Sequence, residues 1–144
     1  MLLKRGGEND GETFWVEAIT NRIQENSQIN KDALQLIGEA NLLRPKASPR
    51  YKRLKEELAM SRQQGMDCIR GYSVDEDYEG WPIKASGKPE YMIIELAYIS
   101  CFHPRDRLIG ISIDYSQRYY PNRQDPHFLD KANAIFNTIE VRNP

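Results

Sequence analysis

Residues 109–116, with the sequence IGISIDYS, decide the fold. Large apolar side chains stand at every second position, at Ile109, Ile111, Ile113 and Tyr115, with small or polar residues between them. Side chains of a β-strand point alternately to the two faces of its sheet. The stretch therefore predicts a strand with one buried and one polar face, and we expect the isoleucine face to pack against helices.

Two further strands are expected before this stretch. Residues 66–74 alternate between the two faces of a strand, and residues 90–102 are rich in β-branched and aromatic side chains. Apolar residues occupy both parities of the second segment, as in a central strand that is covered on both faces. Residues 139–141 add a short edge strand, so we expect an antiparallel sheet of three to four strands.

Helical spacing dominates the first third of the chain. Trp15, Ile19 and Ile23 recur at i, i+4 and i+8, which predicts a helix over residues 13–25. A second helix is expected over residues 30–43, because it begins with an asparagine suited to the N-cap and carries an apolar stripe.

Two serine- or aspartate-proline pairs predict further helices. Ser48-Pro49 is typical of an N-cap followed by proline at the first helical position, so a third helix is expected up to Gly65. Asp125-Pro126 gives the same signal for a C-terminal helix with Phe128 and Phe136 on its inner face. Helices, then strands, then one helix are typical of an α+β protein. The predicted fold class is therefore α+β, with N-terminal helices, an antiparallel three- to four-stranded sheet and a C-terminal helix.

The overall composition narrows the function. The chain has 144 residues, of which 40% are hydrophobic and 28% are charged, as in one globular domain. We expect a flexible N-terminus over residues 1–11 and a single domain over residues 12–144. The net charge of −1 favours no nucleic-acid partner. Glu95 interrupts the most apolar region, so no transmembrane segment is expected. No signal peptide is visible, because Lys4 and Arg5 follow at once after the first three residues.

The chain has two cysteines, Cys68 and Cys101. They cannot form a four-cysteine zinc site, and their spacing is not that of a Cys-x-x-Cys redox pair. Either they are buried free thiols in a cytosolic protein or they form one disulfide in an oxidising compartment. If the first two strands pair with Cys68 opposite Cys101 and Arg70 opposite Ile99, the cysteines lie within bonding range. This register favours the disulfide.

Residues suited to catalysis are sparse. The two histidines, His103 and His127, each lie beside a proline at an expected turn or helix start. A small hydrolase could use His103 as a base oriented by Asp106, but a local hydrogen bond of a turn histidine is favoured. The sequence contains no motif of a known nucleophile, metal or nucleotide site. We therefore expect no enzyme activity, no catalytic residues, no cofactor and no metal.

An acidic and aromatic segment follows the first expected strand. It contains Asp75, Glu76, Asp77, Tyr78 and Trp81. The spacing lacks the glycine and final glutamate of a calcium loop, which leaves a solvated loop or a recognition loop for a basic partner. Tyr78 and Trp81 are of the residue types that anchor protein interfaces, although Trp81 could instead pack under the loop.

Arg118 lies among three tyrosines on the strand that includes residues 114–120. Arginine and tyrosine together suit a protein interface, and they also suit a twisted edge strand. The residues expected to bind a partner are thus Asp75, Glu76, Asp77, Tyr78, Trp81 and Arg118.

Four short motifs carry a resemblance to a known group of proteins. They are Cys68-x-Arg70, Glu76-Asp77, Cys101-x-His103-Pro104 and residues 115–119, YSQRY. In this order they resemble small proteobacterial envelope proteins, many of them lipoproteins, that are encoded near type VI secretion lipase or other toxin genes. Some of these are taken to be immunity proteins. The resemblance covers the half of the chain from Cys68 onward, and it implies a paired-cysteine, periplasmic α+β domain that acts by binding.

The expected function is that of a periplasmic protein-binding domain, an immunity protein that inhibits a secreted bacterial toxin by occluding it. The alternative is a structural or accessory envelope lipoprotein without inhibitory activity. An export signal or lipid anchor is not expected within this chain, and a cytoplasmic location is the alternative to the periplasm.

Overall fold

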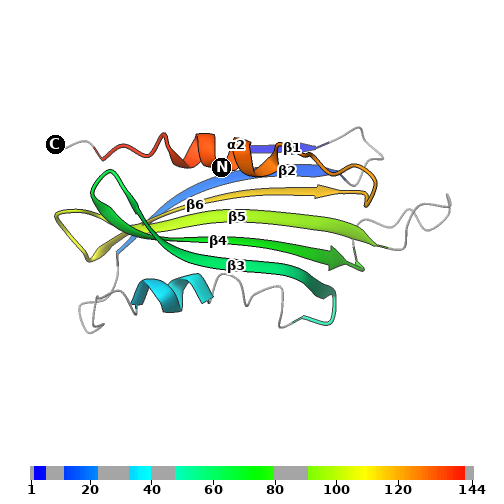
Figure 1. Cartoon of the computed structure of the whole chain (residues 1–144), viewed down its shortest axis with the longest axis horizontal. Helices are drawn as coiled ribbons and strands as arrows, with labels where there is room; N and C mark the ends of the chain where they lie inside the picture. Colours follow the sequence, from blue (N-terminus) through cyan, green and yellow to red (C-terminus); the bar gives the residue numbers. More distant parts are fainter. Residues whose placement is uncertain (1, 6–11, 23–32, 40–47, 80–90, 142–144) are drawn as a thin grey trace.

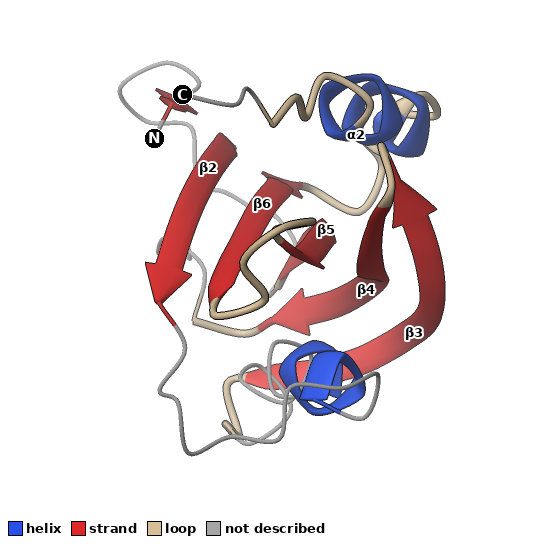
Figure 2. Ribbon diagram, turned by 90° about the vertical axis from the view of Figure 1, so that its left-hand side faces the viewer, coloured by secondary structure: helices blue, strands red, loops and turns tan. Residues whose placement is uncertain are grey.

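The computed structural model describes residues 2–5, 12–22, 33–39, 48–79 and 91–141. These residues form a six-stranded sheet in the spatial order β1-β2-β6-β5-β4-β3, in which all neighbours are antiparallel (Figure 1). Helix α2 lies on one face, and a helix at residues 33–39 lies on the other. Figure 2 shows that the sheet curves, with α2 on its concave side.

The strands are β1 Leu2–Arg5, β2 Thr13–Arg22, β3 Tyr51–Gln63, β4 Met66–Asp77, β5 Met92–Phe102 and β6 Ile109–Tyr119. Strands β4, β5 and β6 are the three that the sequence predicts. Helix α2, Phe128–Phe136, confirms the expected C-terminal helix. The edge strand expected at residues 139–141 does not form. β1 arises inside the segment expected to be a flexible N-terminus, of which residues 6–11 lie outside the described part.

The predicted arrangement of N-terminal helices beside a three- to four-stranded sheet is wrong. Residues 13–22 form β2, where a helix was expected. The reason is that a spacing of four residues is a multiple of the strand period of two, so Trp15 and Ile19 share a face in either structure. Phe14 and Val16 decide between them, because they face the core beside Tyr115 of β6. A helix would have carried them away from that core.

Residues 51–63 form β3 instead of the third predicted helix. β3 and β4 are joined by Gln64 and Gly65, whose φ angles of 51° and 80° are both positive, as a tight hairpin turn requires. Gly65 therefore turns the chain between two strands rather than ending a helix. Of the predicted second helix, residues 33–39 are helical, and residues 30–32 and 40–43 lie outside the described part.

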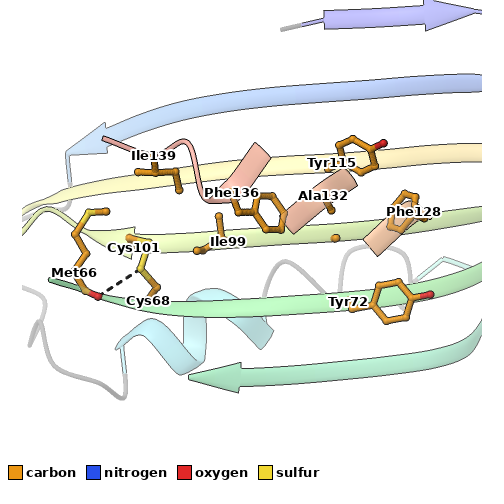
Figure 3. Packing of buried hydrophobic residues seen from close by; sticks show 11 residues of the cluster. Met66, Cys68, Tyr72, Ile99, Cys101, Tyr115, Phe128, Ala132, Phe136 and Ile139 are labelled. Carbon is orange, nitrogen blue, oxygen red and sulfur yellow. Dashed lines mark hydrogen bonds between the residues drawn. A yellow bond between two sulfur atoms is a disulfide. The ribbon is translucent and has the colours of Figure 1, made fainter. Parts of the chain in front are cut away.

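The larger hydrophobic core lies between α2 and the concave face of the sheet (Figure 3). Phe128, Ala132 and Phe136 of α2 cover Tyr115 of β6, and Phe128 and Tyr115 stack edge to face at 5.0 Å. Ile111 and Ile113 pack against the same cluster. The prediction that this face of β6 packs against a helix is thus confirmed for Tyr115, and Ile111 and Ile113 belong to the same core.

The smaller core lies under the helix at residues 33–39, on the convex face. Tyr98 of β5 is fully buried there, and its hydroxyl donates a hydrogen bond of 2.6 Å to the carbonyl of Gly38. Its ring lies over Gly71, the residue directly opposite on β4. A side chain at Gly38 would approach Ile69 to 2.7 Å and Leu58 to 2.9 Å. Both glycines therefore allow close contacts that hold the helix on the sheet.

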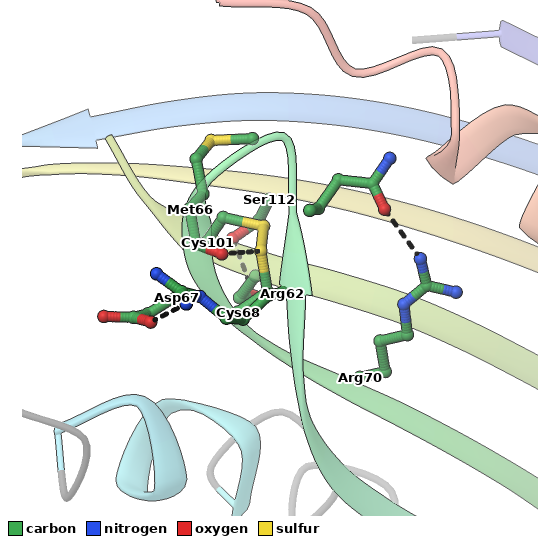
Figure 4. Close-up of a disulfide and its surroundings, with 9 residues drawn as sticks. Arg62, Met66, Asp67, Cys68, Arg70, Cys101 and Ser112 are labelled. Carbon is green, nitrogen blue, oxygen red and sulfur yellow. Dashed lines mark hydrogen bonds and ion pairs between the residues drawn. A yellow bond between two sulfur atoms is a disulfide. The ribbon is translucent and has the colours of Figure 1, made fainter. Parts of the chain in front are cut away.

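Cys68 and Cys101 form a disulfide between β4 and β5, and both are buried (Figure 4). They oppose each other in the register, with Cα atoms 4.0 Å apart, and Arg70 opposes Ile99. The disulfide and the strand register expected from the sequence are both confirmed.

Candidate partner-binding surface

Four strands meet at one end of the sheet, where β3 and β5 begin and β4 and β6 end. Tyr51 pairs with Asp77, and Asp77 pairs with Met92, so antiparallel pairing gathers segments that are distant in sequence. Charged and aromatic side chains cluster there. We call them the sheet-end cluster, and they are Arg50, Lys52, Arg53, Asp75, Glu76, Asp77, Tyr78, Tyr91 and Arg118.

Asp77 is the centre of the cluster. Its carboxylate is fully buried and accepts two hydrogen bonds from Arg50, Nε to Oδ1 at 2.6 Å and Nη2 to Oδ2 at 2.7 Å. Arg118 Nη2 lies 2.8 Å from Oδ2, and the backbone amide of Glu79 donates to Oδ1 at 3.1 Å. Burial alone would raise the pKa of Asp77, but the hydrogen bonds and charges of the two arginines outweigh it and hold the pKa below its ordinary value.

Asp75, two residues earlier on the same face of β4, has its own arginine. Arg53 Nε donates to Oδ1 at 2.6 Å, and Arg53 Nη1 lies 2.8 Å from Glu56. The register of β3 against β4 shifts between Arg53 and Lys55, where β3 gains a residue. Such a bulge changes the direction of neighbouring side chains, and here it lies at the residue that pairs with a buried carboxylate.

Glu76 points to the opposite face and joins a second small network. It accepts hydrogen bonds from the hydroxyl of Tyr78 at 2.5 Å and from the ammonium of Lys52 at 3.1 Å. The Tyr78 hydroxyl and then Lys52 hold the pKa of Glu76 below its ordinary value. Tyr78 also packs at a tilt against Tyr91, with ring centroids 5.6 Å apart, and it remains 43% exposed. Tyr78 is thus an exposed aromatic ring that is held in place by Glu76 and by Tyr91.

The structure brings together most of the residues expected to bind a partner. The sequence suggests Asp77 and Arg118 as two separate contact residues. In the structure, Asp77 of β4 and Arg118 of β6 form an ion pair. The prediction of a loop from residue 75 onward is wrong for residues 75–77, because β4 continues through Asp77. Asp75, Glu76 and Asp77 are therefore buried strand residues with cationic partners in the same chain. Trp81 lies outside the described residues.

Replacing Asp77 with asparagine tests this cluster. Asp77→Asn should lower the free energy of unfolding by about 2–3 kcal/mol at neutral pH, less than for a fully buried pair because both guanidinium groups are partly exposed. The lowered pKa of Asp77 means that its charge stabilises the fold above the unfolded-state pKa of about 4, and that this contribution is lost as the pH falls further. Urea denaturation should therefore show the gap between wild type and variant narrowing below about pH 4. If the difference in unfolding free energy between wild type and variant does not change with pH, Asp77 does not stabilise the fold through its charge.

Glu95 is a structural residue that was not predicted from the sequence. Its carboxylate is buried on the concave face of β5 and accepts hydrogen bonds from Tyr72 at 2.5 Å and Tyr119 at 3.0 Å. Burial and the carboxylate of Glu95 raise the pKa of both tyrosine hydroxyls well above the ordinary value. Both hydroxyls therefore stay protonated and donate their hydrogen bonds to Glu95. The sequence signal that could have revealed this role is a single acidic residue inside a strand that is expected to be covered on both faces.

The residues of the hydrolase alternative make local contacts. The Nδ1 atom of His103 accepts hydrogen bonds from the backbone amides of Arg105 at 3.3 Å and Asp106 at 3.1 Å. The Asp106 carboxylate accepts one from the amide of Leu108 at 3.0 Å. These bonds shape the turn between β5 and β6, as the favoured interpretation of a turn histidine predicts.

The described part of the chain has neither a candidate metal-binding cluster nor a candidate membrane-spanning helix. In these segments no group of three or more histidine, cysteine, aspartate or glutamate side chains is arranged to hold a metal ion. No helix of these segments is both long and apolar enough to cross a membrane.

Comparison with known protein families and with curated proteins finds no match for this chain.

Proposed function

We propose that this protein acts by binding a protein partner at the sheet-end cluster. The observation that carries the proposal is that the ends of four hydrogen-bonded strands hold in place an exposed tyrosine ring, Tyr78, and two partly exposed arginines, Arg50 and Arg118. Tyrosine and arginine are enriched among the residues that contribute most to binding energy. Anchors that are already fixed lose little conformational entropy when a partner binds, which favours affinity.

The partner in this proposal is a secreted bacterial toxin, and the protein is its immunity protein in the periplasm. The Cys68–Cys101 disulfide supports an oxidising compartment, because structural disulfides are rare in the reducing cytosol. Occlusion requires a rigid surface and no chemistry of its own. The buried ion pairs of Asp75 and Asp77 provide such rigidity at the sheet end.

The proposal is tested by capturing the partner from the native envelope and measuring its affinity for variants. Tyr78→Ala should weaken binding about thirtyfold, which corresponds to the roughly 2 kcal/mol of an interface hot spot. Met60→Ala is a matched control, because Met60 has the same 43% exposure as Tyr78 but lies near the hairpin turn at the other end of β3. Thermal denaturation should show both variants folded.

Two results would contradict the proposal. One is equal affinity of Tyr78→Ala and wild type for the captured partner. The other is a captured partner whose toxic activity persists in the complex, which would favour an accessory role over inhibition.

A further inference from the structure

The charges that reach solvent at the sheet end differ from those that the sequence suggests. The acidic residues of β4 predict a basic partner, but Asp77 is fully buried, whereas the side chains of Arg50 and Arg118 are 29% and 22% exposed. The negative charge therefore lies below the surface, and the cationic groups lie above it. Within the set of Arg50, Asp77 and Arg118, a partner can therefore reach the guanidinium groups but not the carboxylate.

The Arg50–Asp77–Arg118 triad carries one excess positive charge, since two guanidinium groups share one carboxylate. That carboxylate already accepts bonds from Arg50, Arg118 and the amide of Glu79, so its roughly four acceptor positions are filled. Arg118 Nε is buried and has no hydrogen-bond partner among the described residues. Each guanidinium group has five N–H donors, so both retain donor capacity beyond their bonds to Asp77.

The neighbouring charges offset this excess only in part. The exposed carboxylate of Glu79 is near enough to act on Arg50 through its charge, as the smallest of the contributions that raise the pKa of Arg50. Lys52 and Glu76 pair with each other on the opposite face. Arg53 is bonded to both Asp75 and Glu56, so that set carries one excess negative charge, centred farther along β3. Arg50 is also held over the ring of Tyr51, at 4.9 Å from the centroid, which fixes the direction of its guanidinium group.

We propose that the sheet end binds an acidic side chain of the protein partner, whose carboxylate is held by Arg50 and Arg118. This inference rests on the proposed partner-binding function and reverses the charge of the partner expected from the sequence. A carboxylate there would form charge-assisted hydrogen bonds with two arginines. It would replace the solvent that covers them, while Asp77 keeps both arginines in position.

The test uses the whole oxidised protein and the NMR signals of arginine Nε–Hε groups. Titration with a hexaglutamate peptide should shift the Arg50 and Arg118 signals saturably, and added salt should weaken the effect. Arg62 and Arg107 are internal controls, because both pair with Asp67 at the opposite end of the sheet, and their signals should not move. A hexalysine peptide should leave all four signals in place.

A variant pair gives a second measurement. Arg118→Gln should weaken hexaglutamate binding about tenfold, as expected for the loss of a charge-assisted hydrogen bond, and Arg107→Gln should not. The arginine NMR signals of the wild-type protein test the proposal even if the Arg118→Gln variant does not fold.

Three results would overturn the inference. They are a hexalysine-dependent shift at Arg118, equal shifts of all four arginines with hexaglutamate, and shifts with inorganic phosphate but not with the peptide. The last would identify a site for small anions. If any of these occurs while the captured partner still depends on Tyr78, the partner-binding function stands and only the acidic contact at Arg50 and Arg118 is wrong.

Discussion

Gly71→Ala should lower the free energy of unfolding by about 4 kcal/mol. A Cβ atom at Gly71 would lie 2.1 Å from Cε1 and 2.2 Å from Cζ of Tyr98. The ring cannot turn aside freely, because it is fully buried and its hydroxyl is bonded to Gly38. The substitution therefore expels the ring, and its cost approaches that of removing a buried aromatic side chain. Urea denaturation provides the measurement.

The paired variant Tyr98→Ala provides the control. Alone it should also destabilise by about 3–5 kcal/mol. Combined with Gly71→Ala it should cost clearly less than the sum, because both substitutions remove the same contact. Strict additivity of the two effects would show that Gly71 and Tyr98 do not pack together.

Replacing both cysteines with alanine should lower the free energy of unfolding by about 3–4 kcal/mol, since the disulfide closes a loop with a sequence separation of 33 residues. Denaturation of the oxidised protein, the reduced protein and the double variant measures the effect. Reduced protein and double variant should lose similar stability, because both regain loop entropy in the unfolded state. An oxidised protein that is no more stable than the double variant would contradict the role of the disulfide.

The sequence predicts the second half of the fold well and the first half poorly. Alternation in β4 and β6 excludes a helix, and the placement of Cys68 and Cys101 on neighbouring strands gives the correct register. In residues 13–22 the i, i+4 spacing fits both structures, and the helix expected over residues 51–63 rested on the Ser48-Pro49 pair before it. In residues 51–63, which are rich in lysine, arginine, glutamate and leucine, local propensity favours a helix, but pairing with β4 overrides it. Pairing with β6 decides for a strand in residues 13–22.

Several residues of the candidate site were predicted from the sequence, but the way they are arranged in space was not. Asp77, Tyr78 and Arg118 were all selected from composition, but as a loop and a separate strand. Arg50 lies in the segment where the third helix was expected, so its position opposite the end of β4 was not foreseen. Register between distant strands decides these contacts, and residue types alone do not reveal it.

Amide hydrogen exchange of the complex with the captured partner tests the central claim most directly. Binding at the sheet end should slow exchange in residues 48–55, 75–79 and 117–119, and it should leave the hairpin around Gly65 unchanged. Slower exchange confined to that hairpin or to α2, with none at the sheet end, would contradict the account.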